Sequence, residues 1–88
     1  MNSIEYQLQS VHEISGVTHF TCTLVTNISP KDENIKHLRS KKTGCRWKVG
    51  SVAFLPVKQV KAGIRMYGVA PIQPGSDAII GDILIGEQ

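Results

Sequence analysis

Lysine and arginine are missing from both ends of this 88-residue chain. Neither the first 29 residues nor the last 23 contain one, and acidic side chains give these ends net charges of −2 and −3. All ten Lys and Arg lie in residues 30–65, against only Asp32 and Glu33, so this stretch has ten positive and two negative charges, a net charge of +8. Charge segregation of this kind informs on partners rather than on fold.

Cysteine is also scarce, and the chain opens without a secretory signal. Two cysteines exclude a disulfide framework, and Met1–Gln9 has neither a basic nor an apolar segment. We therefore expect a reducing, cytoplasmic environment. The longest mostly apolar run, Ala78–Ile85, is too short to span a bilayer and contains Asp82, so no membrane association is expected.

The length and composition are those of one small globular domain, residues 1–88. Apolar residues make up 41% of the chain and charged residues 19%, which argues against disorder. A chain this short buries only a modest core. Its stability is therefore expected to be small or to depend on a partner subunit.

Two segments near the start alternate between apolar and polar residues, which indicates strands with one buried face. The first spans Ile4–Gln9, and the second lies near Thr18–Ile28 with Phe20, Cys22 and Leu24 on one face. The Thr, Val and Phe content of the second segment suits a pleated sheet.

The hydrophobic pattern predicts how these two strands pair. A three-residue loop over residues 14–16, with Gly16 last, places the apolar residues of one strand opposite the apolar residues of the other. This loop pairs Leu8 with Cys22 and Tyr6 with Leu24. A two-residue turn would instead set Gln9 against Cys22, so the longer loop is favoured.

The segment 30–43 has the signals of a helix. Ser29 is a suitable N-cap, Pro30 suits the first helical position, and acidic residues follow in the first turn. Only Ile35 and Leu38 supply an apolar stripe, so packing on the sheet must hold the helix. Without that packing the segment is a mobile basic loop.

Strand patterns resume after Gly44. Cys45, Trp47 and Val49 point to one face, with Arg46 and Lys48 on the other. Gly50-Ser51 indicates a bend or bulge, and further strands are predicted over Val52–Val60, Ile64–Val69 and Ala78–Ile85. A loop at 61–63 would pair Val57 with Tyr67 and Leu55 with Val69.

These elements predict a mostly β (α+β) fold. We expect a small β-barrel or curved antiparallel sheet of about five to six strands, with one short helix inserted after strand 2. Apolar residues on both faces of Val52–Val69 indicate either a closed barrel or a homo-oligomer.

The basic segment is the one feature that points to a function. We expect a non-catalytic module that binds a polyanion, with nucleic acid the most abundant class. The residues predicted to contact phosphate are Lys36, Arg39, Lys41, Lys42, Arg46 and Lys48. Trp47 could stack on a base, although the alternation of its strand predicts that its side chain points into the core. The alternative without a binding function is a solvated basic face that keeps the domain soluble.

The alternative is an oligomeric structural or interaction protein. It would be an assembly component or an inhibitor that docks on an acidic protein surface, and its support is the two-sided apolar patterning in the second half of the chain. Assembly beyond a monomer without nucleic-acid affinity would favour it.

Catalytic, cofactor and metal chemistry find little support. His19 and Cys22 fall on opposite faces of a strand, so they cannot share a zinc ion, and His12, His37 and Cys45 add no second ligand pair. Positive neighbours could activate the Cys45 thiol, yet alternation buries it and no histidine is placed as a base. We therefore predict no enzyme activity, no cofactor and no metal.

Overall fold

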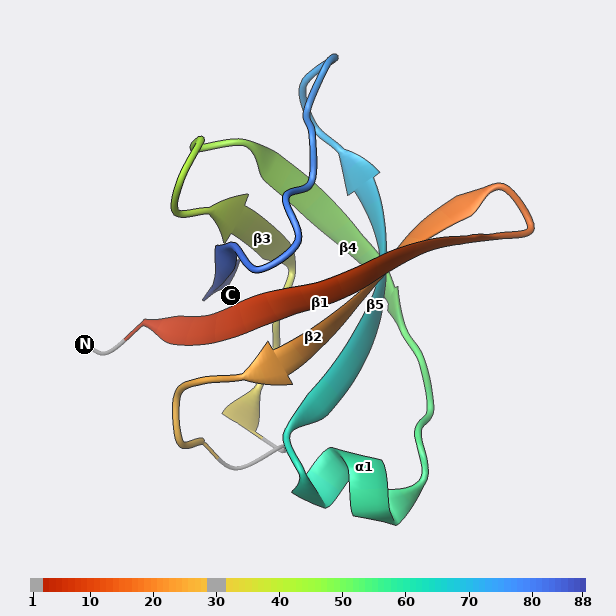
Figure 1. Ribbon diagram of the computed structural model, residues 1–88, viewed down its shortest axis with the longest axis vertical. Helices are drawn as coiled ribbons and strands as arrows, with labels where there is room; N and C mark the ends of the chain where they lie inside the picture. Colours follow the sequence, from red (N-terminus) through yellow and green to blue (C-terminus); the bar gives the residue numbers. More distant parts are fainter. Residues whose placement is uncertain (1–2, 29–31) are drawn as a thin grey trace.

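The computed structural model describes residues 3–28 and 32–88. Its elements are β1 (Ile4–Ile14), β2 (Val17–Leu24), β3 (His37–Ser40), β4 (Arg46–Val52), α1 (Val57–Lys61), β5 (Ile64–Pro71) and β6 (Ile83–Glu87). The six strands close into an antiparallel barrel in the order β1-β2-β5-β4-β3-β6 (Figure 1). The predicted mostly β fold and its small barrel are confirmed.

The barrel interior is filled by the inward-pointing residues of all six strands. The most deeply buried apolar side chains are Tyr6, Leu8, Phe20, Cys22, Leu38, Trp47, Tyr67 and Leu84. Aromatic edges meet aromatic faces inside, with ring centroids 5.6 Å apart for Tyr6 and Tyr67 and 5.1 Å apart for Phe20 and Trp47. Within the part of the chain that the structure describes, no helix has the length and apolarity to cross a membrane.

The first hairpin has the predicted pairs but reaches them by a different route. Tyr6 lies opposite Leu24 and Leu8 opposite Cys22, as expected. The loop, however, is a two-residue turn, with Ile14 opposite Val17. An irregularity in β1 between Leu8 and Ser10 absorbs Gln9 and brings the buried faces back into phase. The prediction of a three-residue loop is therefore wrong.

The helix predicted over 30–43, after the second strand, is also wrong. Ser29 and Pro30, the expected cap, lie outside the described residues, and His37–Ser40 forms β3. This segment pairs with β4 on one side and β6 on the other, so its backbone hydrogen bonds are shared with two strands. Pairing of that extent outweighs local helix signals backed by only two apolar residues.

The helix lies instead where a strand over Val52–Val60 was expected. α1 follows Pro56, whose carbonyl accepts hydrogen bonds from the Gln59 and Val60 N–H groups at 2.9 and 3.2 Å. The predicted partners of Tyr67 and Val69 are therefore wrong. Tyr67 lies opposite Val52 and Val69 opposite Val49.

Two smaller features complete the barrel. The predicted bulge at Gly50-Ser51 is confirmed by an irregularity between Val49 and Ser51. The last strand begins later than the predicted Ala78–Ile85, because a turn with Gly81 at φ 89° precedes it. Asp82 ends this turn by accepting hydrogen bonds from the Ser40 hydroxyl and the Ile83 N–H.

Candidate anion-binding face and the buried barrel end

The structure gathers the six predicted phosphate-contacting residues around β3 and β4. Arg39 lies on β3, Arg46 and Lys48 on β4, and Lys36 immediately before β3. Lys41 and Lys42 lie in the turn that joins the two strands. The predicted residues thus lie on two paired strands, on the turn between them and just before β3, and not on a helix.

Arg39 and Arg46 are directly opposite each other across the two strands. Both approach a single carboxylate on β6: Arg46 Nε donates to Glu87 Oε1 at 2.9 Å, and Arg39 Nε lies 3.6 Å from Glu87 Oε2. The arginine side chains are 45% and 40% exposed, so water screens these contacts. Two guanidinium groups therefore share one weakly held negative charge.

The other cations of the set differ in their surroundings. Lys41 Nζ lies 3.8 Å from Glu5 Oε2. Within residues 3–28 and 32–88, no ion pair is formed by Lys36, Lys42 or Lys48, and all three are exposed. A hollow of about 350 Å³ lies beside Arg39 and Glu87 on the outer surface. The face formed by these residues, which we call the β3–β4 face, has six positive charges against Glu5 and Glu87.

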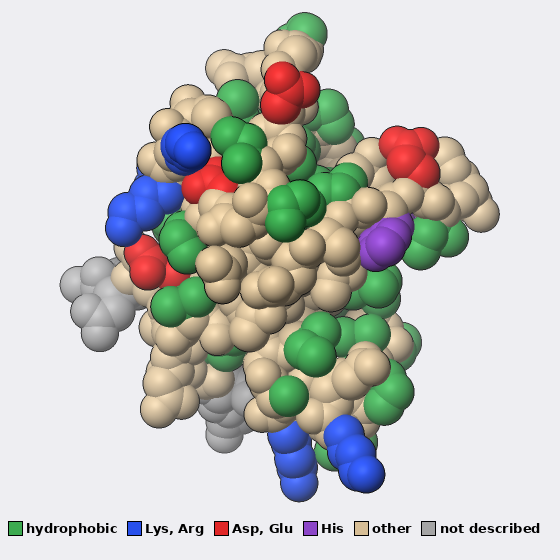
Figure 2. Space-filling model, in the orientation of Figure 1, with side chains coloured by type: hydrophobic (Ala, Val, Ile, Leu, Met, Phe, Trp, Pro, Cys, Tyr) green, Lys and Arg blue, Asp and Glu red, His purple; other side chains and the backbone are tan. Residues whose placement is uncertain are grey.

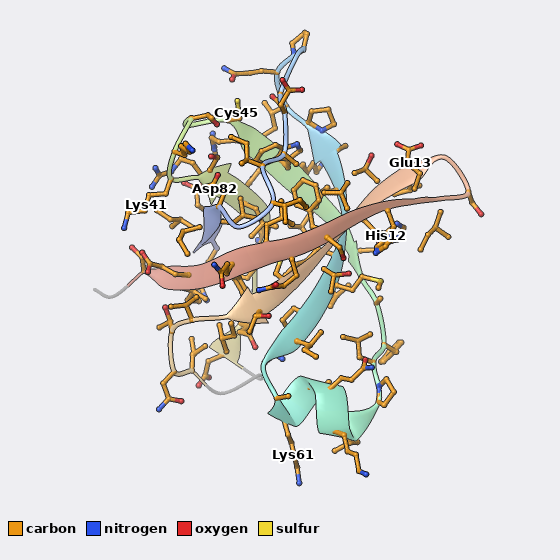
Figure 3. The ribbon with its side chains drawn as sticks, viewed as in Figure 1. His12, Glu13, Lys41, Cys45, Lys61 and Asp82 are labelled. Atoms are coloured by element: carbon orange, nitrogen blue, oxygen red, sulfur yellow. The ribbon has the colours of Figure 1, made fainter. Side chains whose placement is uncertain are left out.

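Cationic side chains also gather at a second place. In Figure 2, Lys and Arg lie both beside the β3–β4 turn, at the left, and below α1, at the bottom. Figure 3 shows Lys41 and Lys61 pointing outward from these two regions. Lys58 and Lys61 of α1 therefore provide an internal comparison for the β3–β4 face.

Aromatic stacking on the β3–β4 face is not supported. Trp47 is 3% exposed and packs against Phe20, so it is not placed to stack on a base. Tyr6 and Tyr67 are also in the core. Among the described aromatic residues, Phe54 alone is on the surface, and it lies between β4 and α1.

The histidines and cysteines do not converge on a metal-like arrangement. His12 and His19 lie opposite each other on the first hairpin, whereas Cys22 is buried in the core. In the described part of the chain, no group of three or more His, Cys, Asp or Glu side chains could hold a metal ion. Cys45 is partly buried against the core.

A buried polar network closes one end of the barrel. Arg65 of β5 points inward and donates to Glu33 from Nε at 3.0 Å and from Nη2 at 2.7 Å. Tyr6 donates its hydroxyl to Glu33 Oε1 at 2.5 Å, and the Tyr67 hydroxyl donates to that of Tyr6 at 3.0 Å. Arg65 Nη1 also donates to the carbonyl oxygens of Val60 and Ile64. The Glu33 and Arg65 side chains are only 4% and 9% exposed.

The network favours the neutral form of Tyr6 and the charged form of Arg65. Burial, followed by the hydrogen bond to Glu33, raises the pKa of Tyr6 well above its ordinary value, so its hydroxyl stays a donor. Burial lowers the pKa of Arg65, but the Glu33 carboxylate more than offsets this, and the pKa is raised. Glu33 and Arg65 thus form a compensated buried ion pair.

Sequence reasoning missed this network, although one signal was present. Arg65 is in phase with Tyr67 and Val69, both of which belong to the apolar face of their strand. An arginine in that phase must be buried and therefore needs a carboxylate. Which carboxylate it meets, Glu33, depends on the path of the chain over the barrel end.

No protein-family model, curated protein or solved structure matches this chain. What the protein binds has to be inferred from its own side chains.

Proposed function

We propose that this protein is a non-catalytic module that binds a polyanion, nucleic acid in the first instance, through the β3–β4 face. The observation that carries the proposal is the arrangement of Arg39 and Arg46 around Glu87. Planar guanidinium groups bind phosphate through paired N–H donors. A phosphate could take the place of the Glu87 carboxylate at little cost, because exposed ion pairs contribute only about 0–1 kcal/mol.

The remaining charges extend the face in two directions. Lys36 and Lys48 lie toward one end of the strand pair, and Lys42 lies at the turn. Such a row suits a phosphate backbone, whose binding weakens steeply with salt because counterions are released. Without a surface aromatic residue on this face, contacts to phosphate rather than stacking on bases would supply the affinity.

The test is fluorescence-anisotropy titration with labelled single-stranded and duplex oligonucleotides at about 50 and 200 mM salt. We expect the double variant Arg39→Gln with Arg46→Gln to bind more weakly and to lower the salt slope by about one per lost phosphate contact. Glu87→Gln should have the opposite effect and strengthen binding, because it removes the competing carboxylate.

The matched control is Lys58→Gln with Lys61→Gln, which removes the same charge from α1. It should leave affinity nearly unchanged at the higher salt, where charges beyond about 8–10 Å are screened. Equal losses in the two double variants would mean that net charge alone drives binding. No binding of the unaltered protein at 50 mM salt would overturn the proposal.

A further inference from the structure

The end of β4 and the segment that leads from it to α1 expose a backbone edge with apolar side chains. Phe54 is fully exposed at 105%, and Val52 and Val57 beside it are 58% and 68% exposed. Isolated surface apolar residues are ordinary, but three within six residues, one of them a fully solvated phenylalanine, form a patch.

The backbone of this edge is unpaired on one side. The Ala53 N–H donates to the Met66 carbonyl of β5 at 2.9 Å. Because strand residues alternate in direction, Val52, the last residue of β4, turns its N–H and C=O groups away from β5. On that side the last bond is from the Val49 N–H to the Lys36 carbonyl, where β3 begins. Among residues 3–28 and 32–88, none forms a backbone hydrogen bond with Phe54.

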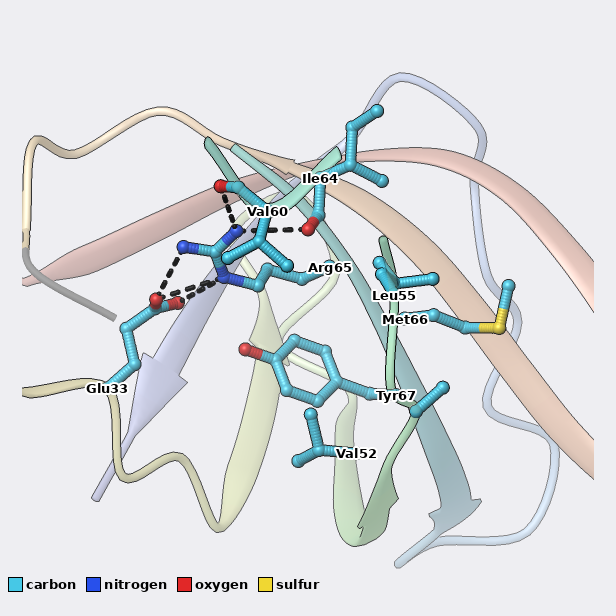
Figure 4. A pocket seen from close by; sticks show the side chains of 9 residues that line it. Glu33, Val52, Leu55, Val60, Ile64, Arg65, Met66 and Tyr67 are labelled. Atoms are coloured by element: carbon cyan, nitrogen blue, oxygen red, sulfur yellow. Dashed lines mark hydrogen bonds and ion pairs between the residues drawn. The ribbon is translucent and has the colours of Figure 1, made fainter. Parts of the chain in front are cut away.

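A cavity of about 180 Å³ lies next to this edge (Figure 4). It is lined by Val52, Leu55, Val60 and Ile64, and the Glu33–Arg65 pair borders it. An apolar cavity of about 150 Å³ can hold a benzene molecule, so this one is large enough for one aliphatic side chain. The edge therefore offers backbone groups and a side-chain pocket together.

We propose that residues 52–55 are a docking edge at which an extended, acidic segment of another protein adds as a further strand. Unpaired backbone donors and acceptors in alternation are satisfied by a polypeptide strand, not by a phosphate backbone or a lipid. One apolar side chain of the segment would enter the cavity, and another would cover Phe54. This surface is separate from the β3–β4 face and does not depend on the function proposed for it.

Charge decides between an acidic partner and a second copy of this chain. α1 follows the edge directly and carries Lys58 and Lys61, which form no ion pair within the described residues. A second copy paired at this edge would add its own Lys58 and Lys61 and no acidic side chain, because residues 52–61 contain none, so the lysines of both copies would stay uncompensated. Acidic residues flanking the added strand would complement them.

The experiment uses three labelled ten-residue peptides as probes. The first alternates valine and threonine between two aspartates at each end, and the second has lysines in place of the aspartates. The third is the acidic peptide with alternate backbone nitrogens methylated, which blocks strand pairing. We expect the acidic peptide to bind, with amide shift changes centred on residues 52–55, and the other two to bind at least about tenfold more weakly.

Phe54→Ser tests the edge itself, and its full exposure means that the variant should fold. It should weaken binding of the acidic peptide at least about tenfold, as expected for loss of a buried phenylalanine. Ile80→Ser removes an exposed apolar side chain elsewhere and should change affinity less than about twofold.

Three results would overturn the proposal. They are no binding of the acidic peptide at about millimolar concentration, equal binding by the methylated peptide, and equal binding by the Phe54→Ser variant. Dimerisation that depends on Phe54, seen by sedimentation, would assign the edge to a second copy instead. Oligonucleotide binding that depends on Phe54 would assign it to nucleic acid.

Discussion

Cys22 shows how completely a single polar side chain can be enclosed by this small barrel. The thiol is 0% exposed, on the inner face of β2 opposite Leu8. Burial raises its pKa from 9.0 to about 12, because the thiolate would lose its hydration. A cysteine in this setting acts as a small apolar core residue and not as a nucleophile.

The pKa of Cys22 predicts an alkaline loss of stability. A thiol whose pKa is raised in the folded state stabilises that state fully below pH 9, and the contribution falls as pH rises toward 12. Urea denaturation of the unaltered protein should show that the Cys22 thiol lowers the free energy of unfolding by about 1 kcal/mol between pH 9 and 10.

Cys22→Ala should lack this component and give a flatter curve over the same interval, at a lower overall stability. The comparison stops at pH 10, because burial raises the pKa of both Tyr6 and Tyr67, and each adds a further loss as pH rises through the ordinary tyrosine value of 10.0. Parallel curves for the two proteins would contradict the assignment.

At the scale of elements, β1 shows how a strand can adjust its phase to the core. Its irregularity at Gln9 lets a tight two-residue turn coexist with Leu8 and Tyr6 on the buried face. On either side of Gln9 the pairing is regular, with Leu8 opposite Cys22 and Ser10 opposite Thr21. Gln9 is therefore an inserted residue on which no other pair depends.

Deletion of single residues tests this reading of β1. Removing Gln9 should leave every cross-strand pair in place and cost less than about 2 kcal/mol. Removing Gln7, two positions earlier, should cost about 3–5 kcal/mol, because it drives Tyr6 or Leu8 from the core to the outer face. Urea denaturation of both deletion variants measures the difference. Comparable destabilisation by the two deletions would show that the extra residue is required.

The same elements show what could be predicted from sequence. The pairs of the first hairpin and the inward direction of Trp47 were correct, because period-two alternation reports directly which side chains are buried. The helix over 30–43 was wrong because capping and charge signals are local, whereas β3 is held by two neighbouring strands. α1 was missed since it has neither a side-chain N-cap nor an acidic first turn, and it buries no residue.

Part of the candidate site could be predicted from the sequence by the same reasoning. The six basic residues are close in sequence, so any fold would keep them near one another. Their counter-charges were not predictable, because Glu87 and Glu5 reach them only through the pairing of β6 with β3 and β1. Glu87 of the C-terminal strand therefore offsets part of the positive charge of the basic segment, which a count of charges along the sequence does not show.

At the scale of the whole molecule, β2 and β3, which follow each other along the chain, lie on opposite sides of the barrel. β2 pairs with β1 and β5, whereas β3 pairs with β4 and β6, so the chain must cross from one group of strands to the other. Glu33 anchors this crossing to Tyr6 of β1 and to Arg65 of β5. Nearby, Ile35 is buried against Gly86, where an added Cβ would lie 2.7 Å from the Ile35 Cδ1.

Because Glu33 bonds to β1 and β5, the two strands that flank β2, its loss should weaken this end of the barrel. Glu33→Gln leaves the Arg65 guanidinium buried without a counter-charge and should lower the free energy of unfolding by about 3–5 kcal/mol. The double variant Glu33→Leu with Arg65→Met removes both charges and should recover a large part of that loss, since a buried pair gains little over apolar packing. Urea denaturation at pH 7, followed by both far-UV circular dichroism and Trp47 fluorescence, measures the change. A double variant less stable than Glu33→Gln would mean that the hydrogen bonds from Tyr6 and to the carbonyls of Val60 and Ile64, rather than charge compensation, close this end of the barrel.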